Sequence, residues 1–129
     1  MPEAKIKYYR DADGSIPVND WLEELKARDR IGYARCVAKI RVLVEMGLDA
    51  RRPTVEYLRD GILELRARHA HIQYRLLFFY QDREVVVLAH SLVKKGSNVP
   101  ESDIDIAADR KRRFETDSKR HTYERDKDY

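Results

Sequence analysis

The fold is decided by residues 62–94, which read ILELRARHAHIQYRLLFFYQDREVVVLAHSLVK. Apolar and polar residues alternate along much of this stretch, and β-branched and aromatic residues are frequent, as is typical of strands. Two short interruptions, at residues 69–72 and at the polar residues 81–84, divide it into three runs. We therefore predict three successive strands joined by two hairpins, which form an antiparallel meander.

The residues before this meander predict one strand and two helices. Ile6 and Tyr8 alternate with polar neighbours, which indicates a short strand with one buried face. Apolar residues then recur at helical spacing after Pro17 and again after Asp29, so we expect a helical hairpin that ends at Gly47. The same spacing predicts that the tryptophan, tyrosine and cysteine side chains of this hairpin belong to the core.

The residues after the meander predict one more helix and a charged end. A glycine and a proline near residues 96–100 break the sheet, and apolar residues from Ile104 to Phe114 follow at helical spacing. The whole pattern predicts an α+β fold in which an N-terminal strand and a helical hairpin pack on an antiparallel three- to four-stranded sheet. We expect one domain over residues 1–114. Residues 115–129 are dense in charge, which predicts a solvated helix extension or a mobile tail.

The composition of the 129 residues excludes several classes of protein. The single cysteine, Cys36, cannot form an internal disulfide or a cysteine-based zinc site. No apolar stretch approaches the roughly 20 residues of a membrane helix, and the first residues lack the apolar core of a signal peptide. We therefore expect a reduced, cytoplasmic protein that makes no membrane contact.

The positive charge of the chain is concentrated in the part that forms the meander. The formal net charge is +3, but nine lysines and arginines stand against five acidic residues between residues 51 and 95. Basic side chains on a rigid apolar scaffold are typical of a site for a polyanion. The alternative at this point is ordinary solubilising charge on a solvated surface.

Strand alternation predicts that most of these basic residues share one side of the sheet. Burying the apolar residues of the first hairpin sets Arg66 opposite Arg75, and the second hairpin is expected to set Phe78 opposite Val87 and Arg75 opposite His90. The basic side then collects Glu64, Arg66, Arg68, Arg75, His90 and Lys94. The same alternation places Leu77, Phe79 and Leu88 there.

Like charges placed directly opposite each other destabilise a sheet, so the pairing of Arg66 with Arg75 needs a cause. One explanation is a bound anion. The other is a carboxylate such as Glu64 between the two guanidinium groups, which would make this an ordinary surface ion pair. His69 and His71 fall in the first hairpin loop and are predicted to be solvated turn residues.

Three segments in this order resemble the HigB-like, phage-derived branch of the RelE/ParE toxin superfamily. They are Leu58-Arg59-Asp60-Gly61-Ile62-Leu63-Glu64-Leu65-Arg66, Tyr74-Arg75-Leu76-Leu77-Phe78-Phe79-Tyr80, and Val87-Leu88-Ala89-His90-Ser91-Leu92-Val93-Lys94-Lys95. The resemblance extends from about Ile6 to Phe114. It implies a RelE-like fold and a toxin of a type II toxin–antitoxin system, which cuts ribosome-bound mRNA without a metal.

The resemblance also implies which residues act. Arg75 matches the strand arginine of the family's Tyr-Arg-Leu motif, and Arg66 and Arg68 match basic residues of the preceding strand. Lys94 and Lys95 match the basic pair that ends the last strand. Some relatives carry a stacking tyrosine shortly after that pair, but residues 97–103 contain no aromatic side chain. The remaining candidates to replace it are His121 and Tyr123.

The chemistry of RNA cleavage suits these residue types. The 2′-OH of RNA is the nucleophile, so the protein must accept a proton, stabilise the charged phosphate and protonate the leaving oxygen. Arginine offers a planar charged fork to phosphate oxygens, which suits Arg75 and Arg66. His90 is the easiest proton carrier, followed by the lysines Lys94 and Lys95. The alternative for His90 is a half-buried strand histidine with no chemical role.

The remaining expectations concern binding residues, cofactors and partners. Arg68 and Arg59 are predicted to bind RNA, and neither a metal nor another cofactor is expected, because no histidine pair or acidic cluster has ligand spacing. The resemblance implies a cognate antitoxin, commonly of the helix-turn-helix type, which we expect on the helical hairpin and the charged tail. Two alternatives stay open: a ParE-like toxin that binds a protein such as gyrase, and a non-catalytic member of the fold.

Overall fold

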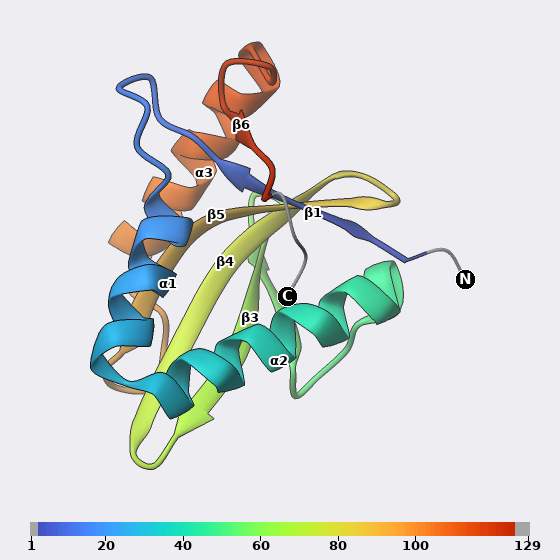
Figure 1. Cartoon of the computed structure of the whole chain (residues 1–129). Helices are drawn as coiled ribbons and strands as arrows, with labels where there is room; N and C mark the ends of the chain where they lie inside the picture. The colour runs from blue at the N-terminus through green and yellow to red at the C-terminus, as the bar shows by residue number, and fades with distance from the viewer. Residues whose placement is uncertain (1–2, 126–129) are drawn as a thin grey trace.

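The computed structural model describes residues 3–125, which form an open six-stranded sheet with helices on both faces (Figure 1). The elements follow one another as β1 (Lys5–Tyr9), α1 (Pro17–Arg28), α2 (Arg30–Met46), the short 3-10 helix η1 (Gly47–Asp49), β2 (Val55–Arg59), β3 (Ile62–His69), β4 (Ile72–Asp82), β5 (Val85–Lys94), α3 (Glu101–Thr116) and β6 (Thr122–Tyr123). The predicted α+β class is confirmed.

The helical hairpin forms as its sequence predicts. Pro17 occupies the first turn of α1, where its missing N–H leaves no hydrogen bond unmade. Asp29 caps α2 by accepting a hydrogen bond of 2.9 Å from the backbone N–H of Gly32. Helix α2 ends at Gly47, whose φ of 54° is readily adopted by glycine.

The sheet has more strands than predicted. Its order is β2-β3-β4-β5-β1-β6, with β1 parallel to β5 and the other neighbours antiparallel. The expectation of three to four strands missed β2 and β6, because β2 is a short edge strand and β6 has only two residues. Neither strand shows the alternation that a longer strand would carry.

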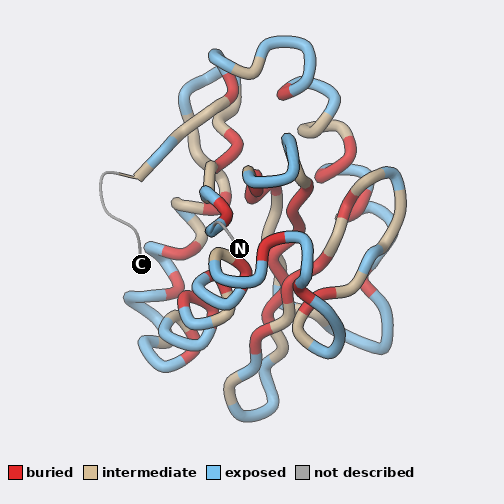
Figure 2. The backbone as a smooth tube through the Cα atoms, turned by 90° about the vertical axis from the view of Figure 1, so that its right-hand side faces the viewer, coloured by how far each residue is buried: buried red, intermediate tan, exposed pale blue. Residues whose placement is uncertain are grey.

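Two apolar cores lie on opposite faces of this sheet (Figures 1 and 2). On the hairpin face, α1 and α2 cover a core that includes Leu65, Leu76 and Phe78. On the other face, which we call the α3 face, α3 packs on Leu77 and Phe79. Helix α3 covers only part of its face, so the α3 face is where polar side chains of the sheet reach the surface.

The register of the first hairpin is confirmed and that of the second is wrong. Leu65 pairs with Leu76 and Arg66 with Arg75, as alternation predicts. In the second hairpin Arg75 pairs with Leu92 rather than His90, and Phe78 pairs with Leu88 rather than Val87.

Two irregularities cause this difference. Ala89 is an extra residue on β5 and Gln81 an extra residue on β4, so the pairing shifts twice. The carbonyl of Ala89 accepts a hydrogen bond of 2.8 Å from Arg110 of α3. The shift also moves Leu88 to the core of the hairpin face, whereas the sequence placed it on the basic side.

Residues 117–125, which follow α3, return to the sheet, although the sequence predicted a solvated extension or a mobile tail there. Helix α3 ends at Thr116, and β6 pairs with β1 at the far edge of the sheet. His121 is buried and stacks on Tyr9 with 5.3 Å between ring centroids. Residues 126–129 of the predicted tail lie outside the described residues.

Among residues 3–125, none of the helices is both long enough and apolar enough to cross a membrane.

Candidate functional site

The polar residues of the α3 face form three rows across β3, β4 and β5. The first row is Arg68, Gln73 and Lys94; the second is Arg66, Arg75 and Leu92; the third is Glu64, Leu77 and His90. Neighbouring strands are about 4.8 Å apart and neighbouring rows about 7 Å apart, as in any sheet. Alternation therefore brings the predicted Arg66, Arg68, Arg75 and Lys94 onto one surface, as the sequence required.

The most basic part of this surface is a hollow beside β3. Strand β2 begins opposite Leu65, so the second half of β3 forms the edge of the sheet there. The hollow has a volume of about 400 Å³, and we call it the β3-edge hollow. Its lining consists of Lys39, Pro53, Thr54, Arg66, Ala67, Arg68, Gln73 and Arg75, which include four basic residues and no acidic one. A site of this charge suits a phosphate group.

A second hollow lies on the other side of Arg66, between β2 and the start of α3. It has a volume of about 250 Å³ and is lined partly by Glu64, Arg66 and Lys94. The side chains of Leu58, Val99 and Ile104 also line it, and they are wholly or partly buried. This β2–α3 hollow is of mixed charge, unlike the β3-edge hollow.

Glu64 lies between the two arginines of the second row. Its carboxylate accepts a hydrogen bond of 2.7 Å from Nε of Arg66, and its other oxygen is 3.5 Å from Nε of Arg75. Glu64 is only 3% exposed, and among the described residues neither Oε2 of Glu64 nor Nε of Arg75 has a hydrogen-bond partner. Arg66 also pairs with Glu56. The carboxylate expected between the two guanidinium groups is therefore present.

Arg75 is held rigidly beneath the surface and is 5% exposed. Its guanidinium donates hydrogen bonds to the carbonyl of Tyr74, at 3.0 Å, and to Oε1 of Gln73, at 2.8 Å. Burial lowers the pKa of Arg75, and the charge of Glu64 opposes that effect. The head of Arg75 is thus fixed toward the first row by its contacts.

His90 reaches the same face but lines neither hollow. Its Nε2 lies 2.7 Å from Oδ1 of Asp103, and its Nδ1 lies 3.3 Å from Nη1 of Arg110, both on α3. Burial lowers the pKa of His90, the Arg110 charge lowers it further, and the Asp103 carboxylate opposes both. Helix α3 therefore holds His90 away from the arginines with which the sequence grouped it.

Arg59 lines the β2–α3 hollow but is absent from the lining of the β3-edge hollow, whereas Lys95 is absent from both linings. Arg59 forms ion pairs with Asp60, Glu101 and Asp105, and these contacts raise its pKa. It thereby ties β2 to the first turns of α3. Lys95 follows the last residue of β5, is exposed, and lines neither hollow.

The two aromatic residues proposed to replace the missing tyrosine lie elsewhere. β6 is four strands away from β3, about 19 Å across the sheet. The Nδ1 of His121 lies 2.7 Å from the carbonyl oxygen of Arg10, and the ring of Tyr123 packs edge-on against Tyr8. Neither candidate therefore lies beside Arg66 or Arg75.

Five of the eight residues that line the β3-edge hollow were not named as site residues from the sequence, and two of these five, Gln73 and Lys39, have side-chain nitrogen donors. Gln73 stands between Arg68 and Lys94 in the first row, and strand alternation could have found it. Lys39 comes from α2, on the other side of the β3 edge. No pattern in the sequence indicates which helical residue borders this edge, so Lys39 could not have been found in that way.

A second carboxylate, Asp29, lies on the hairpin face of the same two strands. Besides capping α2, it accepts a hydrogen bond of 2.6 Å from the Tyr74 hydroxyl and lies 3.1 Å from Nδ1 of His69. These hydrogen bonds, that from Tyr74 first, lower the pKa of Asp29 to about 2. Burial and the Asp29 charge raise the pKa of Tyr74 to about 12. His69 is therefore partly buried against Asp29 and is not the solvated turn residue that was predicted.

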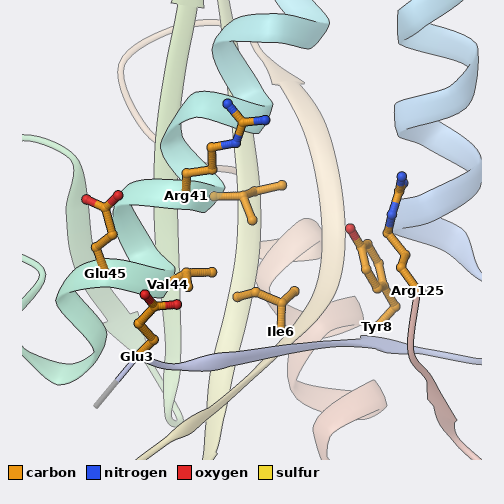
Figure 3. Close-up of a pocket in the computed structure, with 8 residues that line it drawn as sticks. Glu3, Ile6, Tyr8, Arg41, Val44, Glu45 and Arg125 are labelled. Carbon is orange, nitrogen blue, oxygen red and sulfur yellow. The ribbon is translucent and has the colours of Figure 1, made fainter. Parts of the chain in front are cut away.

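A further pocket lies between α2 and β1 on the hairpin face (Figure 3). Its volume is about 200 Å³, and Ile6, Tyr8, Ile40 and Val44 contribute its apolar walls. Figure 3 shows Glu3 and Glu45 toward one end of the pocket and Arg125 at the other. An apolar pocket with mixed charge at its rim suits a protein side chain better than a phosphate.

Residues 3–125 contain no group of three or more histidine, cysteine, aspartate or glutamate side chains that could hold a metal ion. The three rows of the α3 face present guanidinium, ammonium, amide, carboxylate and imidazole groups. Such groups bind and orient a phosphodiester, and they stabilise negative charge as it develops.

One family of known proteins matches the chain. The model of the family described as "Phage derived protein Gp49-like (DUF891)" matches residues 20–112, which contain most of α1, all of α2, strands β2 to β5 and most of α3. The comparison with curated proteins finds no match. Since the family match covers more than two thirds of the sequence, the chain belongs to the Gp49-like family, a toxin-like family of toxin–antitoxin systems within the RelE/ParE-like toxin superfamily.

Proposed function

We propose that this protein is a toxin of the HigB-like branch that cleaves ribosome-bound mRNA by attack of the RNA 2′-OH, without a metal. The observation that carries the proposal is the β3-edge hollow, in which Lys39, Arg66, Arg68 and Arg75 converge without an acidic residue. Four positive side chains around one concave surface match the charge of a phosphodiester and of the more negative transition state that follows.

The positions of these residues suggest which role each of them has in cleavage. Arg66 is about one-third exposed and touches both hollows, so we assign it to the scissile phosphate. Arg68 and Lys39 border the open side of the β3-edge hollow, and we assign them to the neighbouring phosphates. Arg75 is buried, so its charge acts across a short distance in a medium of low dielectric constant, where it is screened less than at the surface. Lys94 is the ammonium group closest in the sheet to Gln73 and serves as the proton carrier in this proposal.

The decisive experiment is primer extension on mRNA from a translating extract that contains the purified protein. We expect discrete cuts with the wild type, and the same cuts in the presence of EDTA at a concentration that leaves ribosomal Mg²⁺ in excess. The double variant Lys39→Ala, Arg68→Ala should lose about 100-fold in cleavage rate, by analogy with removal of transition-state donors. Both side chains are at the rim, so folding should survive.

The matched control is the double variant Arg30→Ala, Arg83→Ala, which removes the same charge from exposed positions outside both hollows. It should cleave as the wild type does. Intact transcripts with the wild-type protein, or equal loss in the two double variants, would contradict the proposal.

One observation favours a second candidate, a toxin that binds its target without cutting RNA. Arg66 is tied to Glu64 and Glu56, and Arg75 is almost fully buried. In addition, both ring nitrogens of His90 have partners on α3. In that case the protein would inhibit DNA supercoiling by gyrase, or another protein target, and mRNA would stay intact.

The antitoxin partner that the family suggests is proposed to be a helix-turn-helix protein encoded beside this gene, docking on the hairpin face. The pocket of Figure 3 supports this site, because it lies where α2, β1 and the last described residues meet. Val44→Asp should then prevent copurification with the product of the adjacent gene. Val42→Asp, on the same helix but outside the pocket, should not.

A further inference from the structure

A second basic hollow lies on the α3 face, at the opposite edge of the sheet. It is formed where β1, β6 and the turn after α3 meet, and its volume is about 490 Å³. We call it the β1–β6 hollow. Lys7, Arg10 and Lys119 line it together with the hydroxyl residues Ser118 and Thr122, the aromatic residue Tyr123 and one acidic residue, Glu124.

The strand register shows on which face of the sheet this hollow lies. Lys7 pairs with Val87, which belongs to the core under α3, so Lys7 points to the α3 face. Thr122 pairs with Tyr9, another member of that core. The β1–β6 hollow and the candidate site therefore lie on the same face of the sheet, toward its opposite edges. Strand β6 is three strands from β4, a lateral distance of about 14 Å.

The cations of this hollow are available to an outside anion. Lys7 donates a hydrogen bond of 3.0 Å to the side-chain amide oxygen of Gln81, and Arg10 donates one of 3.1 Å to the carbonyl of Arg120. Both partners are neutral. Within residues 3–125, no ion pair within 4 Å involves Lys7, Arg10 or Lys119, whereas Glu124 is already paired with Lys5 at 2.8 Å.

The exposed basic side chains of α3, in contrast, form ion pairs with acidic residues of the same helix. Lys111 pairs with Glu115 at 3.0 Å, and Arg113 pairs with Asp109 at 2.9 Å. Arg112 also lies 3.3 Å from Asp109. The exposed part of α3 is thus largely neutralised, and the net positive charge of this face remains at its two flanks.

We infer that the β1–β6 hollow is a second binding site for the phosphate backbone of the RNA, in addition to the site of cleavage. This inference rests on the proposed function. Lysine, arginine and hydroxyl side chains are the groups that bind phosphates without reading bases. A docking site for a protein would instead require an apolar or aromatic centre. The aromatic residue of this hollow, Tyr123, pairs with Tyr8 and packs edge-on against it toward the hairpin face, which leaves polar side chains on the α3 face. The substrate strand therefore contacts both flanks of α3.

The test uses the full-length protein and a short 2′-O-methyl oligoribonucleotide, which cannot be cut because its nucleophile is blocked. Binding is measured by fluorescence anisotropy over a series of salt concentrations. The double variant Lys7→Gln, Lys119→Gln should bind about tenfold more weakly at low salt. It should also reduce the slope of log affinity against log salt by about 1.4, since each phosphate contact to a single strand contributes about 0.7.

The matched control, Arg30→Gln, Arg83→Gln, removes the same charge from exposed positions away from this hollow and should keep the wild-type slope. An equal change of slope in both double variants would overturn the inference. So would displacement of the RNA by a polyglutamate peptide at lower concentration than by unlabelled RNA, which would indicate an acidic protein partner instead.

Failure of this inference can be told from failure of the proposed function. If the slope is unchanged while mRNA is still cut, the second site is wrong and the nuclease stands. If the slope falls as expected while mRNA stays intact, the protein binds RNA at this hollow and the nuclease proposal is wrong.

Discussion

A carboxylate lies on each face of the β3–β4 hairpin, and the two carboxylates differ in how completely they are hydrogen-bonded. Asp29, on the hairpin face, has hydrogen bonds from a backbone N–H, a tyrosine hydroxyl and a histidine. Glu64, on the α3 face, is more deeply buried, yet one of its oxygens and the facing Nε of Arg75 have no hydrogen-bond partner among the described residues.

The difference separates a structural cluster from a candidate functional one. A fully bonded polar cluster fixes the packing of helix on sheet and leaves nothing for a ligand. Buried polar atoms without partners cost free energy, and proteins keep them mainly where another role requires them. The Asp29 cluster should therefore govern stability alone, whereas the Glu64 cluster should govern stability and activity together.

The largest expected effect is that of Glu64→Gln. Removing the charge of Glu64 leaves the buried guanidinium of Arg75 without the carboxylate that faces it, which should lower the free energy of unfolding by about 3 kcal/mol. Urea denaturation measures the change. Glu56→Gln is the control, because it removes another partner of Arg66 at a more exposed position and should cost less than about 1 kcal/mol. Equal effects of the two variants would show that the burial of Glu64 has no energetic consequence.

Gly32→Ala tests the Asp29 cluster. Alanine normally stabilises a helix relative to glycine by up to about 1 kcal/mol, but here the added Cβ would meet the Asp29 carboxylate and lie 2.8 Å from the ring of Tyr74. We expect a loss of about 2 kcal/mol in unfolding free energy, with cleavage of mRNA unchanged. Thermal melting and primer extension on the same preparation check both statements. A stabilised variant would mean that the cluster tolerates displacement of Asp29.

A third test uses pH and should give a smaller effect. The folded-state pKa of Asp29 is about 2, below its ordinary value, so its charged form stabilises the fold at neutral pH. That contribution should disappear as the pH falls from about 4 toward 2. The urea midpoint of the wild type should therefore decline over this range more than that of Asp29→Asn, in which the group cannot titrate. If the urea midpoints of the wild type and of Asp29→Asn fell in parallel as the pH decreased, the lowered pKa of Asp29 would be contradicted.

The Tyr74 hydroxyl supplies the smallest of these effects. Tyr74→Phe removes one of the three hydrogen bonds to Asp29 and keeps the ring that packs against Trp21. The expected cost is about 1 kcal/mol of unfolding free energy, measured by urea denaturation. Cleavage should be unaffected, since the hydroxyl lies on the hairpin face. A loss of cleavage with unchanged stability would mean that the two faces are coupled.

Features of the fold that depend on neighbouring residues in the sequence could be predicted, and features that depend on contacts between distant residues could not. The turn at Ala70 and His71 is short, so alternation fixed the register of Arg66 against Arg75 correctly. The second register depends on extra residues at Gln81 and Ala89. The carbonyl of Ala89 is satisfied by Arg110, which is 21 residues away. Local alternation contains no sign of such a contact.

The candidate site likewise contains residues that strand alternation predicts and residues that only the packing of the helices places. The basic residues contributed by β3, β4 and the end of β5 were found, because one rule of alternation places them all. Lys39 was missed and His90 was misplaced, because helices α2 and α3 decide where these two side chains lie. Ion pairing of Arg59 likewise depends on α3 and cannot be derived from β2 alone.

The position of β1 has a consequence for biosynthesis. This strand is the first to leave the ribosome, yet its two neighbours in the sheet are β5 and β6, which are translated about 80 and 115 residues later. Until then β1 has an unsatisfied backbone on both sides, and the Tyr9 side of the core cannot close. A nascent chain of this protein therefore acquires the complete six-stranded sheet only after β6 has been translated, so the edge of the sheet that contains β1 is the last part to close.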